Sequence, residues 1–184
     1  MRIVAGKFRG KALLSPTSDS IRPTSDRARE SVFNILASRI GVHLDGVKVL
    51  DLFAGTGALG LEAISRGATS AVFVDTDAEA RGIIRDHIEA FGIAGFAKLL
   101  RRDATALGPA GTMGPFNLVF LDPPYGKGLG ELALLSLRDG NWLAPDATIV
   151  LEDSTEIDLI LPEGFQLDDR RLYGAAAVHF IRQV

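Results

Sequence analysis

The sequence predicts an α/β fold: a doubly wound, mostly parallel sheet that ends in an antiparallel hairpin. Three observations lead to this prediction. From residue 47 onward, apolar strands alternate with helical segments, which is typical of a parallel sheet. The strands are apolar throughout, so helices should cover both faces of the sheet. No helical segment separates the last two strands, which lie within residues 165–184 around Gly174, so these two should pair antiparallel.

The chain begins with a different pattern. Short β-like runs at residues 2–5 and 11–14 predict a small N-terminal β-hairpin. Residues 15–26 are rich in Ser, Thr, Pro and Asp, a composition that favours a linker. A helix should begin at Asp26, because apolar residues then recur at helical spacing. These residues are Val32, Phe33, Ile35, Leu36 and Ile40.

The alternating region supplies seven strands in all, of which the last two form the terminal hairpin. The five earlier strands are predicted at 47–53, 70–75, 96–101, 116–122 and 147–153. Helices are predicted at 57–67, 77–91 and 129–138. Thr76 is placed to cap the second of these helices, and Gly92 should end it. Trp142 follows the third helix and is expected in the core.

Composition narrows the class of protein. A chain of 184 residues with 47% hydrophobic and 23% charged residues fits one globular domain, or one domain with a small extension. Cysteine is absent, which excludes disulfides, thiolate zinc sites and a cysteine nucleophile and suits a reducing cytosol. We therefore expect a cytoplasmic protein. No apolar run is long enough to span a membrane, and the first residues, MRIVAGKFRGK, contain no apolar core of the kind found in signal sequences.

The net charge of −3 conceals an asymmetry. Residues 1–30 hold seven Lys and Arg against three acids, a net +4, and the rest of the chain carries −7. A basic segment on an acidic body suggests a polyanionic partner. A solvated N-terminus of mixed charge explains the same numbers equally well.

A glycine-rich loop joins the first strand of the sheet to its helix. Gly55, Gly57 and Gly60 match G-x-G-x-x-G, and Asp75 ends the next strand twenty residues after Gly55, as in dinucleotide-binding folds. Asp51, directly before the loop, would repel a pyrophosphate. The spacing D-x-F-x-G-x-G, which includes Phe53, therefore favours the cationic methyl donor S-adenosylmethionine over a nicotinamide dinucleotide. A tight turn without a ligand is the third alternative.

Aspartates lie at or just beyond the carboxyl ends of four predicted strands: Asp51, Asp75, Asp103 and Asp122. Because the carboxyl ends of parallel strands meet at one crevice, these side chains should lie together. We expect Asp51 near the amino-acid part of the donor, Asp75 on its ribose and Asp103 on the adenine amino group, with Ala104 beside it. Asp103 could instead cap a short helix at 104–107.

The fourth strand of the sheet runs directly into Asp122, Pro123, Pro124 and Tyr125. The two prolines remove backbone donors and fix the direction of the neighbouring carbonyl groups. A carboxylate, a rigid carbonyl and an aromatic ring could orient the exocyclic amine of a nucleobase and stack on that base. A rigid turn at the end of a strand is the structural alternative. The preceding glycine loop and its acids favour the functional interpretation.

The combined motifs resemble a known family. MRIVAGKFRGK, IRPTSDRARESVFNIL at 21–36, DLFAGTGALGLEAISRGA at 51–68 and DPPY are similar to the bacterial guanine-N2 methyltransferases of small-subunit (16S) ribosomal RNA. The resemblance implies a Rossmann-like class I methyltransferase domain at 21–184, preceded by an RNA-binding hairpin extension and linker at 1–20. It also implies methyl transfer from S-adenosylmethionine to the N2 amine of one guanosine, with S-adenosylhomocysteine as the product and no metal.

The resemblance also assigns residues. The cofactor would contact Asp51, Phe53, Gly55, Gly57, Asp75, Thr76, Asp103 and Ala104. The target base would contact Asp122, Pro123, Pro124 and Tyr125. Ribosomal RNA would meet Arg2, Lys7, Arg9, Lys11, Arg22 and Thr24. The family usually has Glu where this chain has Asp75, so Asp77 is an alternative ribose ligand.

The expected partner is ribosomal RNA in assembled small-subunit particles, with ribosomal proteins as further contacts, and the protein is expected to be a monomer. Two other functions remain open. One is methylation of adenine N6 in DNA or RNA, although the stretch between Tyr125 and the next strand is too short for a separate target-recognition region. The other is a non-catalytic RNA-binding module that keeps the methyltransferase fold.

Overall fold

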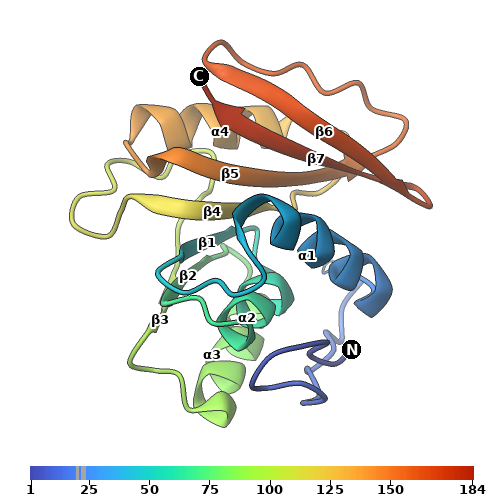
Figure 1. Ribbon diagram of the computed structural model, residues 1–184, viewed down its shortest axis with the longest axis vertical. Coiled ribbons are helices and arrows are strands. Elements are labelled where there is room, and N and C mark those ends of the chain that lie inside the picture. The colour runs from blue at the N-terminus through green and yellow to red at the C-terminus, as the bar shows by residue number, and fades with distance from the viewer. Residues whose placement is uncertain (20, 22–23) are drawn as a thin grey trace.

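The computed structural model describes residues 1–19, 21 and 24–184 (Figure 1). Its helices are α1 (Asp26–Ile40), α2 (Ala58–Ser65), α3 (Ala78–Phe91) and α4 (Leu129–Asp139). Its strands are β1 (Lys48–Leu52), β2 (Ser70–Val74), β3 (Ala97–Leu100), β4 (Phe116–Leu121), β5 (Leu143–Ser154), β6 (Phe165–Tyr173) and β7 (Ala176–Gln183). No helix in the described residues is long and apolar enough to cross a membrane.

The strands form one seven-stranded sheet in the order β3-β2-β1-β4-β5-β7-β6. The first five strands in this order are parallel, and β7 pairs antiparallel with both β5 and β6. The predicted α/β class, with its antiparallel C-terminal hairpin, is therefore confirmed. The order changes direction between β1 and β4, which is where open α/β sheets bind ligands.

Helices cover the two faces of the sheet unequally. Buried residues of α1, α2 and α3 form one core cluster with the sheet, and those of α4 form a second cluster with the opposite face. Trp142 belongs to the second cluster and is fully buried, as expected. The strands β1, β2 and β4 are thus buried on both sides, which accounts for their continuous apolar sequences, whereas the edge strand β3 is only partly buried and exposes Lys98.

Side-chain caps fix where two helices begin. Ser25 caps α1, because its hydroxyl accepts a hydrogen bond from the Ala28 amide at 3.1 Å. Asp77 caps α3 by accepting from the Ala80 amide at 2.8 Å. The prediction that Thr76 caps α3 was therefore wrong by one residue. Asp and Thr both suit this position, so composition alone did not separate them.

The N-terminal hairpin is present but irregular. One isolated antiparallel bridge joins Arg2 to Ala12, and no longer strand forms in this part of the described chain. Backbone hydrogen bonds still join its two runs, from the Ile3 amide to the Lys11 carbonyl at 2.9 Å and from the Leu13 amide to the Met1 carbonyl at 3.0 Å. Contacts with the helices also hold the segment, since the Lys7 amide donates to the Ser65 carbonyl and Ile3 and Leu13 are buried with α1 and α2. In Figure 1 the segment lies beside α2 and α3.

A buried ion pair fastens this segment to the domain. Glu62 and Arg29 are fully buried, and Arg29 Nε donates to Glu62 at 3.3 Å. Glu62 also accepts from the amides of Val4 at 2.9 Å and Ala5 at 3.0 Å, and from Arg66 Nε at 3.0 Å. The Arg29 guanidinium in turn donates to the Arg2 carbonyl. Arg29 is one of the seven Lys and Arg counted in residues 1–30, but its charge is neutralised inside the core and adds nothing to a basic surface.

We predict that Glu62→Ala destabilises the protein by about 3–5 kcal/mol, since it leaves the Arg29 charge and the Val4 and Ala5 amides without their acceptor. Urea unfolding measures the change. Glu30→Ala, an exposed position on α1, is the control and should stay within about 0.5 kcal/mol of the wild type. A loss below about 1 kcal/mol, typical of a surface pair, would contradict the buried role of Glu62.

Candidate active site

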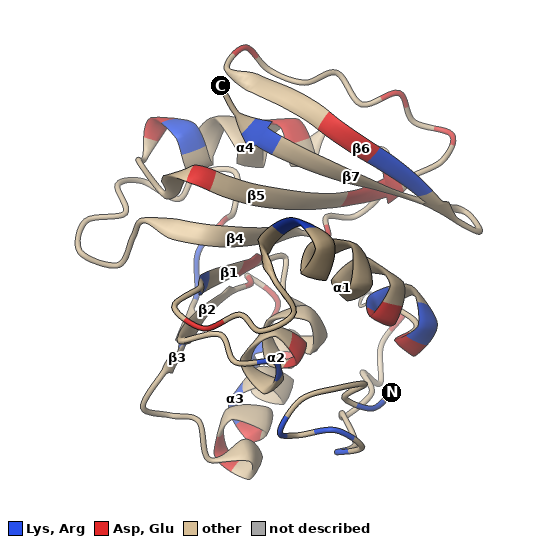
Figure 2. Ribbon diagram, in the orientation of Figure 1, with Lys and Arg blue, Asp and Glu red and all other residues tan. Residues whose placement is uncertain are grey.

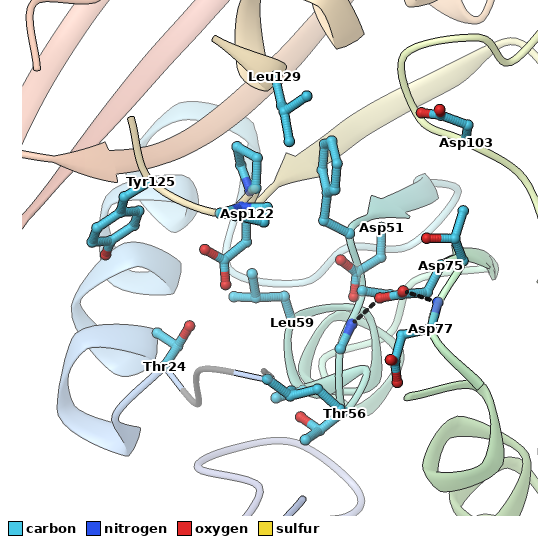
Figure 3. Close-up of a pocket in the computed structure, with 18 residues that line it drawn as sticks. Thr24, Asp51, Thr56, Leu59, Asp75, Asp77, Asp103, Asp122, Tyr125 and Leu129 are labelled. Carbon is cyan, nitrogen blue, oxygen red and sulfur yellow. Dashed lines mark hydrogen bonds between the residues drawn. The ribbon is translucent and has the colours of Figure 1, made fainter. Parts of the chain in front are cut away.

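The strands converge at their carboxyl ends on a cavity of about 480 Å³. Leu52 pairs with Val74 on one side and with Leu121 on the other, so the loops after β1, β2 and β4 start at the same edge. Most of the predicted site residues line this cavity: Thr24, Asp51, Phe53, Gly55, Asp75, Thr76, Asp103, Asp122, Pro123, Pro124 and Tyr125. Figure 3 shows Asp75 and Asp103 on one side of it and Tyr125 and Thr24 on the other.

The three loop glycines have different roles. Gly55 lines the cavity at a φ of 58°, a conformation that favours glycine. Gly57 does not line it and instead starts α2 at a φ of 77°. Gly60 packs against the core, where an added Cβ would lie 2.4 Å from the Phe73 ring. Phe53 also has a positive φ, 55°, which is unusual for a non-glycine residue and places strain next to the cavity.

Asp51 is a carboxyl group held in an apolar environment. Only 1% of it is exposed, and its Oδ2 accepts a hydrogen bond from the Gly60 amide at 3.0 Å. Burial raises the pKa of Asp51 to about 8, the Gly60 hydrogen bond opposes this rise, and the negative charge of Asp75 adds to it. A cation bound in the cavity would stabilise the ionised form of Asp51, whereas an anion would destabilise it.

Asp75 and Asp77 hold the neighbouring turn. Asp75 Oδ2 accepts from the Gly55 amide at 2.9 Å, and its Oδ1 accepts from the Asp77 amide at 2.9 Å (Figure 3). Asp77 lines the cavity too, although its carboxylate also caps α3. Both acids therefore border the space expected for a ribose.

Asp103 closes the far end of the cavity. Its Oδ1 accepts from the hydroxyl of Thr105 at 2.7 Å and from the Thr105 amide at 2.8 Å, and these bonds lower the pKa of Asp103. The structure shows a turn at 104–106 rather than a helix. Asp103 thus both caps a turn and lines the cavity, while Ala104 is buried and does not line it.

Two contacts from β5 fix the loop after β4. The Tyr125 hydroxyl donates to Glu152 Oε1 at 2.5 Å. One residue later, the Gly126 amide donates to Asp153 Oδ1 at 3.2 Å. Together with the two prolines, these contacts hold Asp122 and Tyr125 in one arrangement at the cavity.

The residues that line the cavity do not include four of those predicted to meet RNA: Arg2, Lys7, Arg9 and Lys11. Figure 2 shows Lys and Arg positions along the N-terminal segment. Lys7 and Lys11 stack on Phe8, with their ammonium groups 4.8 and 4.9 Å from the ring centre. All four side chains remain exposed, so they can still reach phosphates. Arg22 lies outside the described residues.

His87 connects the N-terminal segment to the glycine loop. The Leu14 amide donates to His87 Nε2 at 2.8 Å, so this nitrogen carries no proton, and Nδ1 then donates to the Thr56 carbonyl at 2.9 Å. Burial lowers the pKa of His87, which favours this neutral form. Among the described residues, no group of three or more His, Cys, Asp or Glu could hold a metal ion.

Asp77, named from the sequence only as an alternative ribose ligand, lines the cavity. Six further lining residues were not selected from the sequence: Ile21, Ala54, Thr56, Ala58, Leu59 and Leu129. Most are apolar, and nothing in their type distinguishes a cavity wall from a core. Glu152 was also missed. It lies within β5, two residues before the end of this strand, so its place beside the loop after β4 depends on strand pairing and no local sequence signal marked it.

Comparison with known proteins gives matches over most of the chain. A family model described as conserved hypothetical protein 95 matches residues 1–182. The ribosomal RNA small subunit methyltransferase D of Escherichia coli K12 is 39% identical over 181 residues, covering 96% of this chain and 87% of that protein. The Haemophilus influenzae protein of the same name is 34% identical, covering 91% and 86%. The solved structure of the candidate methyltransferase yhhF from Escherichia coli has a TM-score of 0.84 at 32% identity, covering 100% and 97%.

We predict that Asp51→Asn changes the pH dependence of stability in the protein without ligand. The pKa of Asp51 is higher in the folded state (about 8) than its ordinary value of 3.8, so the folded protein binds more protons between these values. Wild-type stability should therefore fall as pH rises through this window, and the Asn variant should lack that contribution. Urea unfolding at pH 5, 6, 7 and 8 should show the variant gaining stability over the wild type with each step.

Asp146→Asn, at an exposed position in β5, is the matched control and should follow the wild type at every pH. An Asp51→Asn difference that stays constant from pH 5 to 8 would show that Asp51 is ionised throughout.

Proposed function

The chain belongs to the conserved hypothetical protein 95 family, and on that basis we propose that it transfers a methyl group from S-adenosylmethionine to the N2 amine of a guanosine in small-subunit ribosomal RNA. The family resemblance found in the sequence is confirmed. The observation that carries the proposal is that one cavity is lined by the Asp122–Tyr125 loop, by Asp51 near the end of β1, and by Asp75 and Asp103, which follow β2 and β3.

The cavity fits a cationic methyl donor. Asp51 is a buried hydrogen-bond acceptor. Its carboxylate would repel a pyrophosphate and attract an ammonium or sulfonium group. Gly55 leaves space at the cavity wall, since a Cβ there would lie 3.2 Å from Ile21. We assign Asp51 to the amino-acid part of the donor, Asp75 to the ribose with Asp77 beside it, and Asp103 to the adenine amine. When bound, S-adenosylmethionine supplies an electrophilic methyl group.

The loop after β4 would orient the amine that accepts the methyl group. The nitrogen lone pair of such an amine is delocalised into the base, so the amine is a weak nucleophile. Asp122 and the Pro123 carbonyl would each accept a hydrogen bond from one of its two N–H groups and so fix the direction of the lone pair. The Tyr125 ring would stack on the base. The amine can lose its proton after the transfer, and Asp122 passes that proton to water. The reaction therefore depends mainly on positioning.

The N-terminal segment would hold the RNA backbone. Arg2, Lys7, Arg9 and Lys11 are exposed and lie outside the cavity, as expected for contacts that position RNA without reading its sequence. Their small number favours an already folded ribonucleoprotein particle over any free RNA. We therefore propose assembled small subunits as the substrate, with ribosomal proteins as further contacts and a monomeric enzyme.

The central experiment measures label transfer from radioactive S-adenosylmethionine to immature small subunits, naked ribosomal RNA and duplex DNA. Label in N2-methylguanosine from the subunits supports the proposal, and mapping then locates the modified nucleotide. Label in N6-methyladenine would support the alternative reaction on adenine. No label in any substrate would support a non-catalytic module.

We predict that Asp122→Ala lowers the rate of methyl transfer at least about 100-fold, because the amine loses one of its two acceptors. Binding of S-adenosylmethionine, measured by calorimetry, should change little, since Asp122 is not among the residues assigned to the cofactor. Asp146→Ala is the control and should keep full activity. Normal turnover by Asp122→Ala would refute the assigned role.

We also predict that Arg9→Ala weakens binding to small subunits and lowers the slope of log affinity against log salt by about 1, as expected for one lost phosphate contact. Arg9 is chosen because it is exposed and none of the ring stacking or side-chain hydrogen bonds found in the described residues involves it. The control is Arg170→Ala on β6, at the far edge of the sheet. An unchanged salt slope in the Arg9 variant would exclude this residue from the RNA contact.

A further inference from the structure

A second cavity of about 620 Å³ adjoins the first, and Thr24 lines both. It lies between the first turns of α1 and the region where the end of β5 meets the turn from β6 to β7. Its polar lining includes Ser31, Glu152 and Tyr173, and the Ser31 and Tyr173 hydroxyls are 2.7 Å apart. The space available to a base at the Asp122–Tyr125 loop therefore continues toward Glu152.

Strand register places Glu152 next to Asp122. Leu121, the last residue of β4, pairs with Leu151 of β5 in parallel, so Asp122 follows this pair on one chain segment and Glu152 follows it on the other. Phe120 and Val150 belong to the core cluster on the α1 face. Because side chains alternate along a strand, Asp122 and Glu152, two residues further on, face this same side. The two carboxylates are thus neighbours at the carboxyl edge of the sheet.

Glu152 also lies at the boundary between the two cavities. Its Oε1 accepts a hydrogen bond from the hydroxyl of Tyr125, which lines the first cavity. Glu152 itself lines the second cavity. No other hydrogen bond to the Glu152 carboxylate is found among the described residues. Oε2 is therefore the oxygen that a ligand between the cavities can reach.

We propose that Glu152 determines specificity for guanine by accepting the N1–H of the target base, while Asp122 holds the adjacent N2 amine. This inference rests on the proposed function and deepens it. Guanine carries N1–H and N2–H₂ donors side by side on its Watson–Crick edge, which matches two adjacent carboxylates that only accept. Adenine has an acceptor at N1, which a carboxylate would repel. The pair Asp122 and Glu152 therefore favours guanine both by attraction and by repulsion of the alternative base.

The test replaces the mapped guanosine by 2-aminopurine in reconstituted small subunits. This analogue keeps the amine at C2 but has an unprotonated N1. The wild type should prefer guanosine by at least about tenfold in kcat/KM, as expected for one charged hydrogen bond. In Glu152→Gln the side-chain amide can donate to N1 of the analogue, so the preference should fall by at least about tenfold. Loss of other contacts by the analogue, such as to O6, affects both proteins and cancels in this comparison.

Tyr125→Phe separates specificity from loop positioning. If Glu152 served only to hold the tyrosine hydroxyl, removing that hydroxyl and changing Glu152 would alter the preference for guanosine equally. We expect Tyr125→Phe to keep the wild-type preference, whatever its effect on the overall rate.

Equal use of guanosine and 2-aminopurine by the wild type would overturn the inference, and this result does not depend on any variant folding. An unchanged preference in Glu152→Gln would overturn it too. In both cases the wild type still methylates guanosine, so the proposed function stands. Failure of the wild type to methylate guanosine at all would instead contradict the proposed function.

Discussion

Arg29 and Glu62 place opposite charges inside the core at the point where the N-terminal segment, α1 and α2 meet. Burying such a pair costs hydration energy that the pair alone does not recover, so it is stable only when further hydrogen bonds complete it. Here Glu62 accepts hydrogen bonds from two backbone amides of the N-terminal segment, and Arg29 donates hydrogen bonds to the carbonyls of Arg2 and Thr24. Correct pairing therefore requires all three parts to be in place together.

This constraint extends to the cavity. Thr24, which the Arg29 guanidinium contacts, lines the space expected for the base, and α2, which carries Glu62, begins at the glycine loop. His87 adds a second connection, from Leu14 of the N-terminal segment to the carbonyl of Thr56. The segment proposed to bind RNA and the loop proposed to bind the cofactor are thus parts of one packed unit. An RNA held by this segment has a defined position relative to the cofactor site.

The sequence allowed the sheet and most of the site to be predicted because both depend on local patterns. Apolar strands and the acids that follow them identify the carboxyl edge without any knowledge of packing. Arg29 was misjudged because only its distant partner, Glu62, distinguishes a buried arginine from an exposed one. The N-terminal hairpin is less regular than predicted, because its backbone bonds partly within the hairpin and partly to α2. Glu152 was missed because only the pairing of β4 with β5 brings it beside Asp122, and this pairing cannot be read from the local sequence.

The distribution of charge then explains how an acidic protein can act on RNA. Acids gather at the carboxyl edge of the sheet, where Asp51, Asp75, Asp122 and Glu152 would repel phosphates. A nucleobase carries no charge and presents N–H donors, so it can enter where the backbone cannot. The RNA backbone must stay at the exposed cations of the N-terminal segment, which do not line the cavity. Such a separation admits only a base that has left its helix, because a stacked and paired base would bring its phosphates with it.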